Sequence, residues 1–95
     1  MGWPQVVSAE LGAIIITAPD CLHCIELQAH LSERPLEIPC HWIEQKNAGD
    51  LFQRFPLFAQ SIDVLPFAGI FSNGKVKAVI RAASRERIEE GLSEP

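Results

Sequence analysis

The fold of this chain is most constrained by a short apolar run that passes at once into a helix signal. Residues 13–17 read Ala-Ile-Ile-Ile-Thr. Such an uninterrupted, β-branched run is typical of a strand covered on both faces, as in a parallel or mixed sheet with helices on either side. Pro19 ends the strand, and Asp20 can cap the helix that follows. Apolar residues then recur at helical spacing as far as Leu31, which predicts one buried helix face.

Two cysteines lie at this junction, Cys21 and Cys24, separated by Leu22 and His23. Cys21 is expected at or just inside the helix N-terminus, where unpaired backbone N–H groups and the helix dipole stabilise a thiolate. A thiolate is the species that attacks a disulfide, and the two intervening residues bring Cys24 round one helical turn. The motif therefore contains both halves of a thiol–disulfide exchange reaction.

The spacing also predicts different roles for the two thiols. Cys21 is expected to be the exposed nucleophile, whereas Cys24 shares the apolar helix face with Leu27 and is expected to be the resolving thiol. His23 is a third catalytic candidate, because an imidazole, especially a protonated one, favours the Cys21 thiolate. The neighbouring carboxylate of Asp20 acts in the opposite direction.

The rest of the chain predicts a single domain over residues 1–95, in which residues 1–12 form an extended lead-in. A second strand is expected at residues 36–43, although Pro39 within it prefers strand starts or edges. Residues 51–60 have helical spacing interrupted by Pro56, which predicts a kinked helix or two short ones.

The C-terminal third predicts a hairpin followed by a helix. Residues 67–71 form an apolar third strand, and Asn73-Gly74 supplies the positive φ angles of a tight turn. Residues 75–81 alternate as an outer strand at the sheet edge, and Ser84 can cap a last helix. The expected order is β-α-β-α-β-β-α around a four-stranded mixed sheet, with the first and third strands parallel to each other and inside.

Three features in this order resemble the thioredoxin-like superfamily, which includes thioredoxins and glutaredoxins. They are the Cys21–Cys24 motif after the first strand, Val64-Leu65-Pro66 before the third, and the Asn73-Gly74 hairpin before the final helix. The resemblance covers about residues 13–92. It implies a three-layer α/β/α sandwich and a thiol–disulfide oxidoreductase, and the Cys-x-His-Cys form is similar to that of protein disulfide isomerases.

The resemblance also implies a substrate site. In the family the proline is cis and packs beside the active-site disulfide, and the residue before it offers backbone hydrogen bonds to substrate. This assigns Pro66 and Leu65 to substrate binding, and Phe67 is expected to border the site. The implied enzyme needs no bound cofactor. It acts on protein disulfides or dithiols and exchanges electrons with an external thiol reductase or oxidant.

Two alternatives stay open. A binding module could keep the fold and hold a partner in the cleft around Pro66 without catalysis. A structural zinc site would instead use Cys21, Cys24, Cys40 and His41, but adjacent residues of a strand point to opposite faces, which disfavours this ligand set. Cys40 is interpreted as a buried apolar filler.

Composition limits the partners and the compartment. The net charge is −4 and the eight Lys and Arg residues are scattered, so nucleic acid is not an expected partner. The longest apolar run, residues 13–16, is too short to span a bilayer, and no secretory signal is visible. Three cysteines, an odd number, argue against a framework of structural disulfides. We therefore predict a cytoplasmic protein with no membrane partner.

Overall fold

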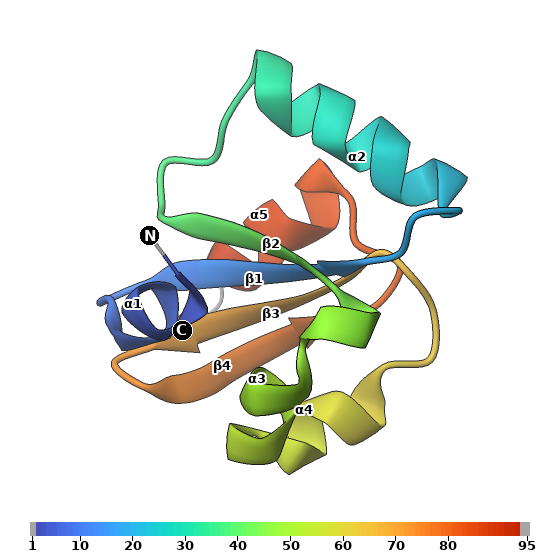
Figure 1. Ribbon diagram of the computed structural model, residues 1–95. Coiled ribbons are helices and arrows are strands. Elements are labelled where there is room, and N and C mark those ends of the chain that lie inside the picture. The colour runs from blue at the N-terminus through green and yellow to red at the C-terminus, as the bar shows by residue number, and fades with distance from the viewer. Residues whose placement is uncertain (1, 94–95) are drawn as a thin grey trace.

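The computed structural model describes residues 2–93 and shows one sheet with helices on both faces (Figure 1). In chain order the elements are α1 (Trp3–Ser8), β1 (Gly12–Thr17), α2 (Leu22–Glu33), β2 (Cys40–Glu44), the 3-10 helix η1 (Gln45–Asn47), α3 (Gly49–Arg54), α4 (Pro56–Ser61), β3 (Phe67–Ser72), β4 (Lys75–Ile80) and α5 (Arg85–Ser93). The predicted α/β sandwich with a mixed four-stranded sheet is confirmed. The ends of the predicted domain, residues 1 and 94–95, lie outside the described residues, and its extent stays a prediction. No helix within the described range is long and apolar enough to cross a membrane.

The strand order is β2-β1-β3-β4, so β1 and β3 are the inner strands as expected. β1 pairs parallel with β2 but antiparallel with β3, and the prediction that the first and third strands are parallel is wrong. The connection between β2 and β3 leaves at Glu44, beside Thr17, and returns at Phe67, beside Ile16. The connection therefore starts and ends at the same end of the sheet, which makes β3 antiparallel to β1. A parallel β3 would have required a crossover to the opposite end of the sheet.

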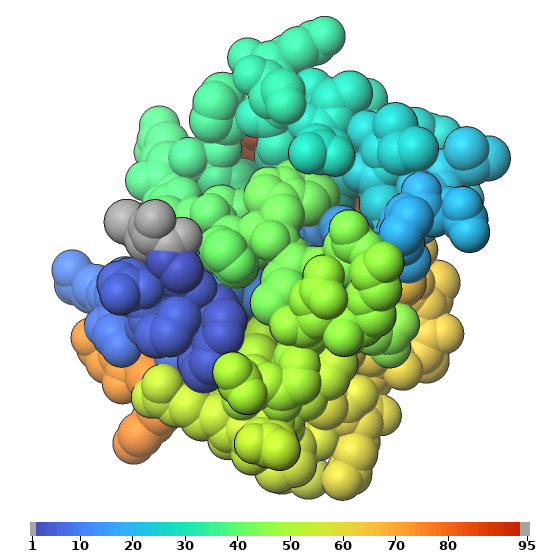
Figure 2. All heavy atoms as spheres, in the orientation of Figure 1, coloured from blue at the N-terminus to red at the C-terminus, as the bar shows by residue number. Residues whose placement is uncertain are grey.

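The sheet separates two hydrophobic cores. Alternate residues of β1 serve each core, because successive side chains of a strand point to opposite faces. With α2 and α5 lie Ala13, Ile15, Leu27, Leu31, Ala68, Ile70, Ile80, Ala83 and Ile88. With α1, α3 and α4 lie Val6, Val7, Ile14, Ile16, Leu51, Phe58, Phe67 and Phe71. In Figure 2 the blue atoms of α1 and the yellow-green atoms of α3 cover this second face, and little of β1 shows between them.

Several local predictions are confirmed. The helical segment at residues 51–60 is two short helices that meet at Pro56, the first residue of α4. The hairpin turn has positive φ at Asn73 and Gly74, 51° and 85°. The hydroxyl group of Ser84 accepts a hydrogen bond from the Arg87 backbone N–H at 3.2 Å, as a helix cap does.

Two elements differ from the prediction. The N-terminal segment is the helix α1 and not an extended lead-in, because Pro4 is tolerated in a first helical turn and Val6 and Val7 are fully buried. The second strand begins at Cys40 and not at residue 36. Pro39 precedes it and accepts a hydrogen bond from the Ala13 backbone N–H at 2.9 Å, but proline has no N–H to continue the ladder.

The contact of α1 with β1 generates a stability prediction. A Cβ atom on Gly12 would lie 2.4 Å from the carbonyl oxygen of Val6, which is backbone and cannot turn away. We expect Gly12→Ala to lower the free energy of unfolding by about 2 kcal/mol and the melting temperature by about 10 °C. Gly49 is the matched control, because its Cβ would meet nothing within 4 Å. Equal melting temperatures for Gly12→Ala and Gly49→Ala, measured by circular dichroism, would contradict the proposed close packing.

Candidate active site

The cysteine motif lies at the N-terminus of α2, just after the loop that connects β1 to this helix. Cys21 is the N-cap of α2, and its Sγ accepts a hydrogen bond from the Cys24 backbone N–H at 3.0 Å. The expectation that Cys21 falls at the helix N-terminus is thus confirmed, but the cap is Cys21 and not Asp20. The backbone of Cys21 is still extended (φ −91°, ψ 104°), so the helix starts one residue later than a cap at Asp20 requires.

Cys21 and Cys24 form a disulfide, with the two Sγ atoms 2.17 Å apart and the two Cα atoms 5.1 Å apart. The two residues differ in exposure. Cys21 is half-buried, whereas Cys24 is only 4% exposed, on the face of α2 that is directed at the sheet. A reactant in solution therefore meets the sulfur of Cys21 first.

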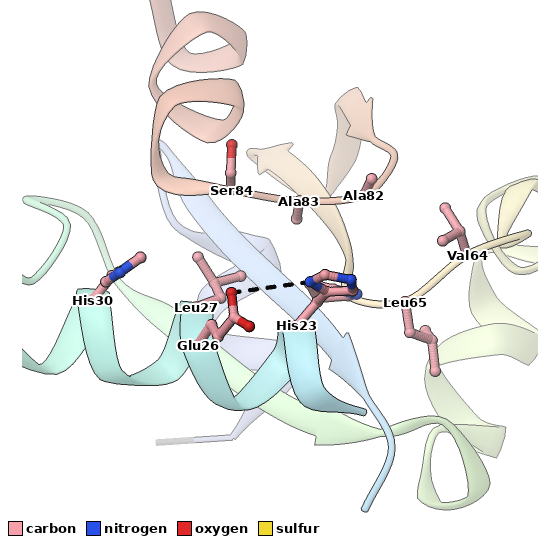
Figure 3. A pocket seen from close by; sticks show the side chains of 10 residues that line it. His23, Glu26, Leu27, His30, Val64, Leu65, Ala82, Ala83 and Ser84 are labelled. Carbon is pink, nitrogen blue, oxygen red and sulfur yellow. Dashed lines mark ion pairs between the residues drawn. The ribbon is translucent and has the colours of Figure 1, made fainter. Parts of the chain in front are cut away.

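A groove of about 340 Å³ borders this motif and is built from three segments. One wall is α2, which contributes His23, Glu26, Leu27 and His30. The others are residues 64–66, before β3, and residues 82–84, between β4 and α5. Figure 3 shows His23 and Leu27 on the side of α2 that faces residues 82–84, with Leu65 at one end of the groove.

The groove has an apolar floor and one acidic side chain at its rim. Among the described residues that line the groove, Glu26 is the only Asp, Glu, Lys or Arg. Its Oε2 lies 4.0 Å from Nδ1 of His23. Both side chains are exposed, so the pair contributes little to stability. The peptide bond between Leu65 and Pro66 is cis, and Pro66 is buried while Leu65 is half-buried.

The structure brings most of the predicted site residues together. His23, Leu65 and Pro66 all line the groove beside the disulfide. Phe67 does not line it. This ring is fully buried on the other face of the sheet, with its centroid 5.6 Å from that of Phe58.

The sequence reasoning missed other parts of the groove. Glu26 lies three residues after His23, and His30 lies four residues after Glu26. The helical period could therefore have placed all three on one face. Residues 82–84 follow a strand, and the helix cap predicted at Ser84 gave no sign that they line the site. Only the hairpin, which returns the chain to the disulfide end of the sheet, brings them to the site.

The zinc alternative is not supported by the placement of its ligands. Cys40 pairs with Ala13, near the start of β1. Thr17, the last residue of β1 before the cysteine motif, lies four residues further along the strand. Four strand residues correspond to about 13 Å, and the motif lies further along the chain. Within residues 2–93 no three side chains of His, Cys, Asp or Glu gather as a metal site requires.

Cys40 is instead a half-buried free thiol that packs against the core beneath α2 and α5. Its burial disfavours the thiolate and raises the pKa of the thiol from the ordinary 9.0 to about 11. The prediction of a buried apolar filler agrees with this packing against the core, although the residue is half-buried and not fully buried. Cys40 is therefore unsuited to exchange chemistry at neutral pH.

Comparison with known proteins identifies the fold. No family profile matches the chain, and no curated protein matches it in sequence. Among solved structures, a protein described as having a thioredoxin fold superimposes with a TM-score of 0.71 at 13% identity, over 96% of this chain and 86% of that one. The oxidised thioredoxin of Plasmodium falciparum superimposes with a TM-score of 0.67 at 12% identity, over 92% of this chain and 82% of that one. Oxidised thioredoxin O2 of Arabidopsis thaliana has a TM-score of 0.64 at 16% identity, over 95% of this chain and 83% of that one.

The chain therefore has the thioredoxin fold. This fold, together with a Cys21–Cys24 pair at disulfide distance, supports a function of the redox type. At identities this low the likeness concerns the fold alone, and the activity has to be argued from the site.

The raised pKa of Cys40 makes a labelling prediction. At pH 7.5 its thiolate fraction should be about 100-fold below that of an ordinary thiol, because the pKa lies about two units higher. We expect iodoacetamide to modify Cys40 of the oxidised protein about 100-fold more slowly than in urea. The rate should rise about tenfold per pH unit towards pH 11. Equal rates in the folded and the unfolded protein would contradict the burial.

Proposed function

We propose that the protein is a thiol–disulfide oxidoreductase that exchanges disulfides with protein substrates through Cys21 and Cys24. One observation carries the proposal: a disulfide at a helix N-terminus joins the half-buried Cys21 to the buried Cys24, beside a groove that His23 of the same motif lines. Such an arrangement supplies an attacking thiol and a resolving thiol in fixed positions.

The first step begins with the reduced pair. The Cys24 backbone N–H, 3.0 Å from Sγ of Cys21 in the oxidised structure, stabilises negative charge on that sulfur. The Cys21 thiolate attacks one sulfur of the substrate disulfide, and a mixed disulfide forms while the other substrate sulfur leaves as a thiolate. His23, one residue before Cys24, favours this anion when its imidazole is protonated.

The second step uses the buried thiol. Cys24 loses its proton and attacks Sγ of Cys21, which releases the second substrate thiolate and leaves the Cys21–Cys24 disulfide. Cys24 is held next to the bond that it attacks, so proximity compensates for its burial. Two electrons have then passed from the protein to the substrate. An external thiol reductase resets the pair, and no bound cofactor is required.

The surface around the disulfide suits a protein substrate. Leu22, Ile25 and Val64 are large apolar residues that are 73%, 56% and 40% exposed near the motif and the groove. Leu22 and Ile25 belong to the first turns of α2 and Val64 lines the groove, and exposed apolar side chains of this kind are suited to contact with a protein. Within this surface Leu65 offers backbone hydrogen bonds to the substrate and Pro66 packs against the mixed disulfide.

The cytoplasm is the proposed compartment, because its thiol reductants would return the pair to the dithiol state. A non-catalytic binding module remains the second candidate, and the same groove favours it. The two proposals differ in one property, which is whether the partner becomes covalently attached to Cys21.

Trapping tests this difference. In a Cys40→Ser background, reduced Cys24→Ser protein should attack the disulfides of insulin through Cys21 but lack the thiol that resolves the adduct. We expect a covalent one-to-one adduct by mass spectrometry, which dithiothreitol reverses. With dithiothreitol as the electron donor, the protein with both cysteines should instead reduce insulin catalytically.

Cys21→Ser in the same background is the matched control and should form no adduct. If Cys21→Ser traps insulin and Cys24→Ser does not, the two roles are reversed. If neither traps it and the unaltered pair reduces no protein disulfide, the oxidoreductase proposal fails and the binding module gains support.

A further inference from the structure

We propose that the ion pair between Asp63 and Arg81 is a positioning device that holds the substrate-contacting wall of the groove. The inference rests on the proposed function and assigns a role to two residues outside the disulfide motif. Neither residue lines the groove, but each directly adjoins a segment that does. Asp63 precedes residues 64–66, and Arg81 precedes residues 82–84.

The geometry of the pair is that of a bidentate clamp. Nε of Arg81 donates to Oδ1 of Asp63 at 3.1 Å, and Nη2 of Arg81 donates to Oδ2. Two parallel hydrogen bonds between a planar guanidinium and a carboxylate fix their mutual orientation, which a single contact does not. The two residues are 18 positions apart in sequence, so the clamp joins two separate loops.

A second contact joins the same two loops. The backbone N–H of Ala83 donates to the carbonyl oxygen of Pro66 at 2.7 Å. Between the two contacts Ala82 has φ of +46°, a left-handed conformation that residues with a Cβ atom seldom adopt. Such a backbone persists only when its surroundings determine it. The clamp on one side and the Ala83 hydrogen bond on the other supply that constraint.

The clamp matters because both loops lie outside regular structure. Residues 62–66 connect α4 to β3, and residues 81–84 connect β4 to α5. The ladder between β3 and β4 ends with Ala68 opposite Ile80. Beyond that pair, the clamp and the Ala83 hydrogen bond join the two loops. A protein substrate has to bind along residues 64–66, whereas a small disulfide needs to reach only Cys21. Loss of the clamp should therefore weaken the binding of protein substrates and leave sulfur chemistry unchanged.

The test compares two substrates in one set of variants. In Arg81→Gln and in Asp63→Asn we expect the KM for insulin to rise about threefold to fivefold, the size that an exposed ion pair supports. The kcat for insulin with dithiothreitol as the electron donor, the single-turnover rate of the reduced protein with hydroxyethyl disulfide and the reduction potential should stay at the wild-type values. Arg81→Lys keeps the positive charge but loses the planar guanidinium. Its KM for insulin should lie between that of the wild type and that of Arg81→Gln.

The matched control is Lys46→Gln. It breaks the exposed ion pair with Glu44, 3.5 Å apart, on residues that do not line the groove, and it should leave the KM unchanged. The exchanged pair Asp63→Arg with Arg81→Asp should recover most of the wild-type KM, because it restores the attraction between the loops. Recovery separates a positioning pair from two residues that each contact the substrate.

The outcomes distinguish this inference from the function on which it rests. A wild-type protein that reduces neither insulin nor hydroxyethyl disulfide overturns both. An active wild type with an unchanged KM in Arg81→Gln overturns the inference alone, as does an equal loss with both substrates. Hydrogen exchange at the Ala83 amide is the second measurement: in folded Arg81→Gln it should accelerate relative to Lys46→Gln, and equal protection overturns the clamp.

Discussion

The site depends on the pairing of β1. This strand is hydrogen-bonded to β2 on one edge and to β3 on the other, and its first five residues are buried. Because both cores rest on it, the direction and the end point of β1 are fixed within narrow limits. α2 then packs Leu27 and Leu31 against the same core as Ile15. The position of Cys21 is thus a result of sheet packing, and the helix N-terminus supplies N–H groups to a sulfur that the strand has placed.

Features that depend on local residues could be predicted from the sequence. The strand of residues 13–17, the break at Pro56 and the Asn73-Gly74 turn each follow from the conformations that those residues allow. The orientation of β3 could not be predicted this way, because it depends on which end of the sheet the long connection returns to. The helix α1 was missed for a related reason. Six residues give a weak helical pattern, and the burial of Val6 and Val7 is what stabilises it.

The candidate site divides in the same manner. The cysteine spacing makes a one-turn pair predictable, and the structure has that pair as a disulfide. The groove was only partly predictable, because its walls come from segments that meet through the sheet topology. Phe67 shows the limit of reasoning from sequence neighbourhood. It adjoins Pro66 in the chain, but the alternation of a strand turns its ring to the opposite core.

The position of Cys40 determines how many covalent forms the oxidised chain has. Three cysteines allow three different intramolecular pairings, and a thiol near an exchanging disulfide would invite isomerisation among them. Cys40 begins β2 beside Ala13, at the end of β1 remote from the N-terminus of α2, so in the folded protein only the pairing of Cys21 with Cys24 is within bonding reach. Intramolecular oxidation of the folded chain therefore has a single product, and the dithiol and this disulfide form one two-electron couple.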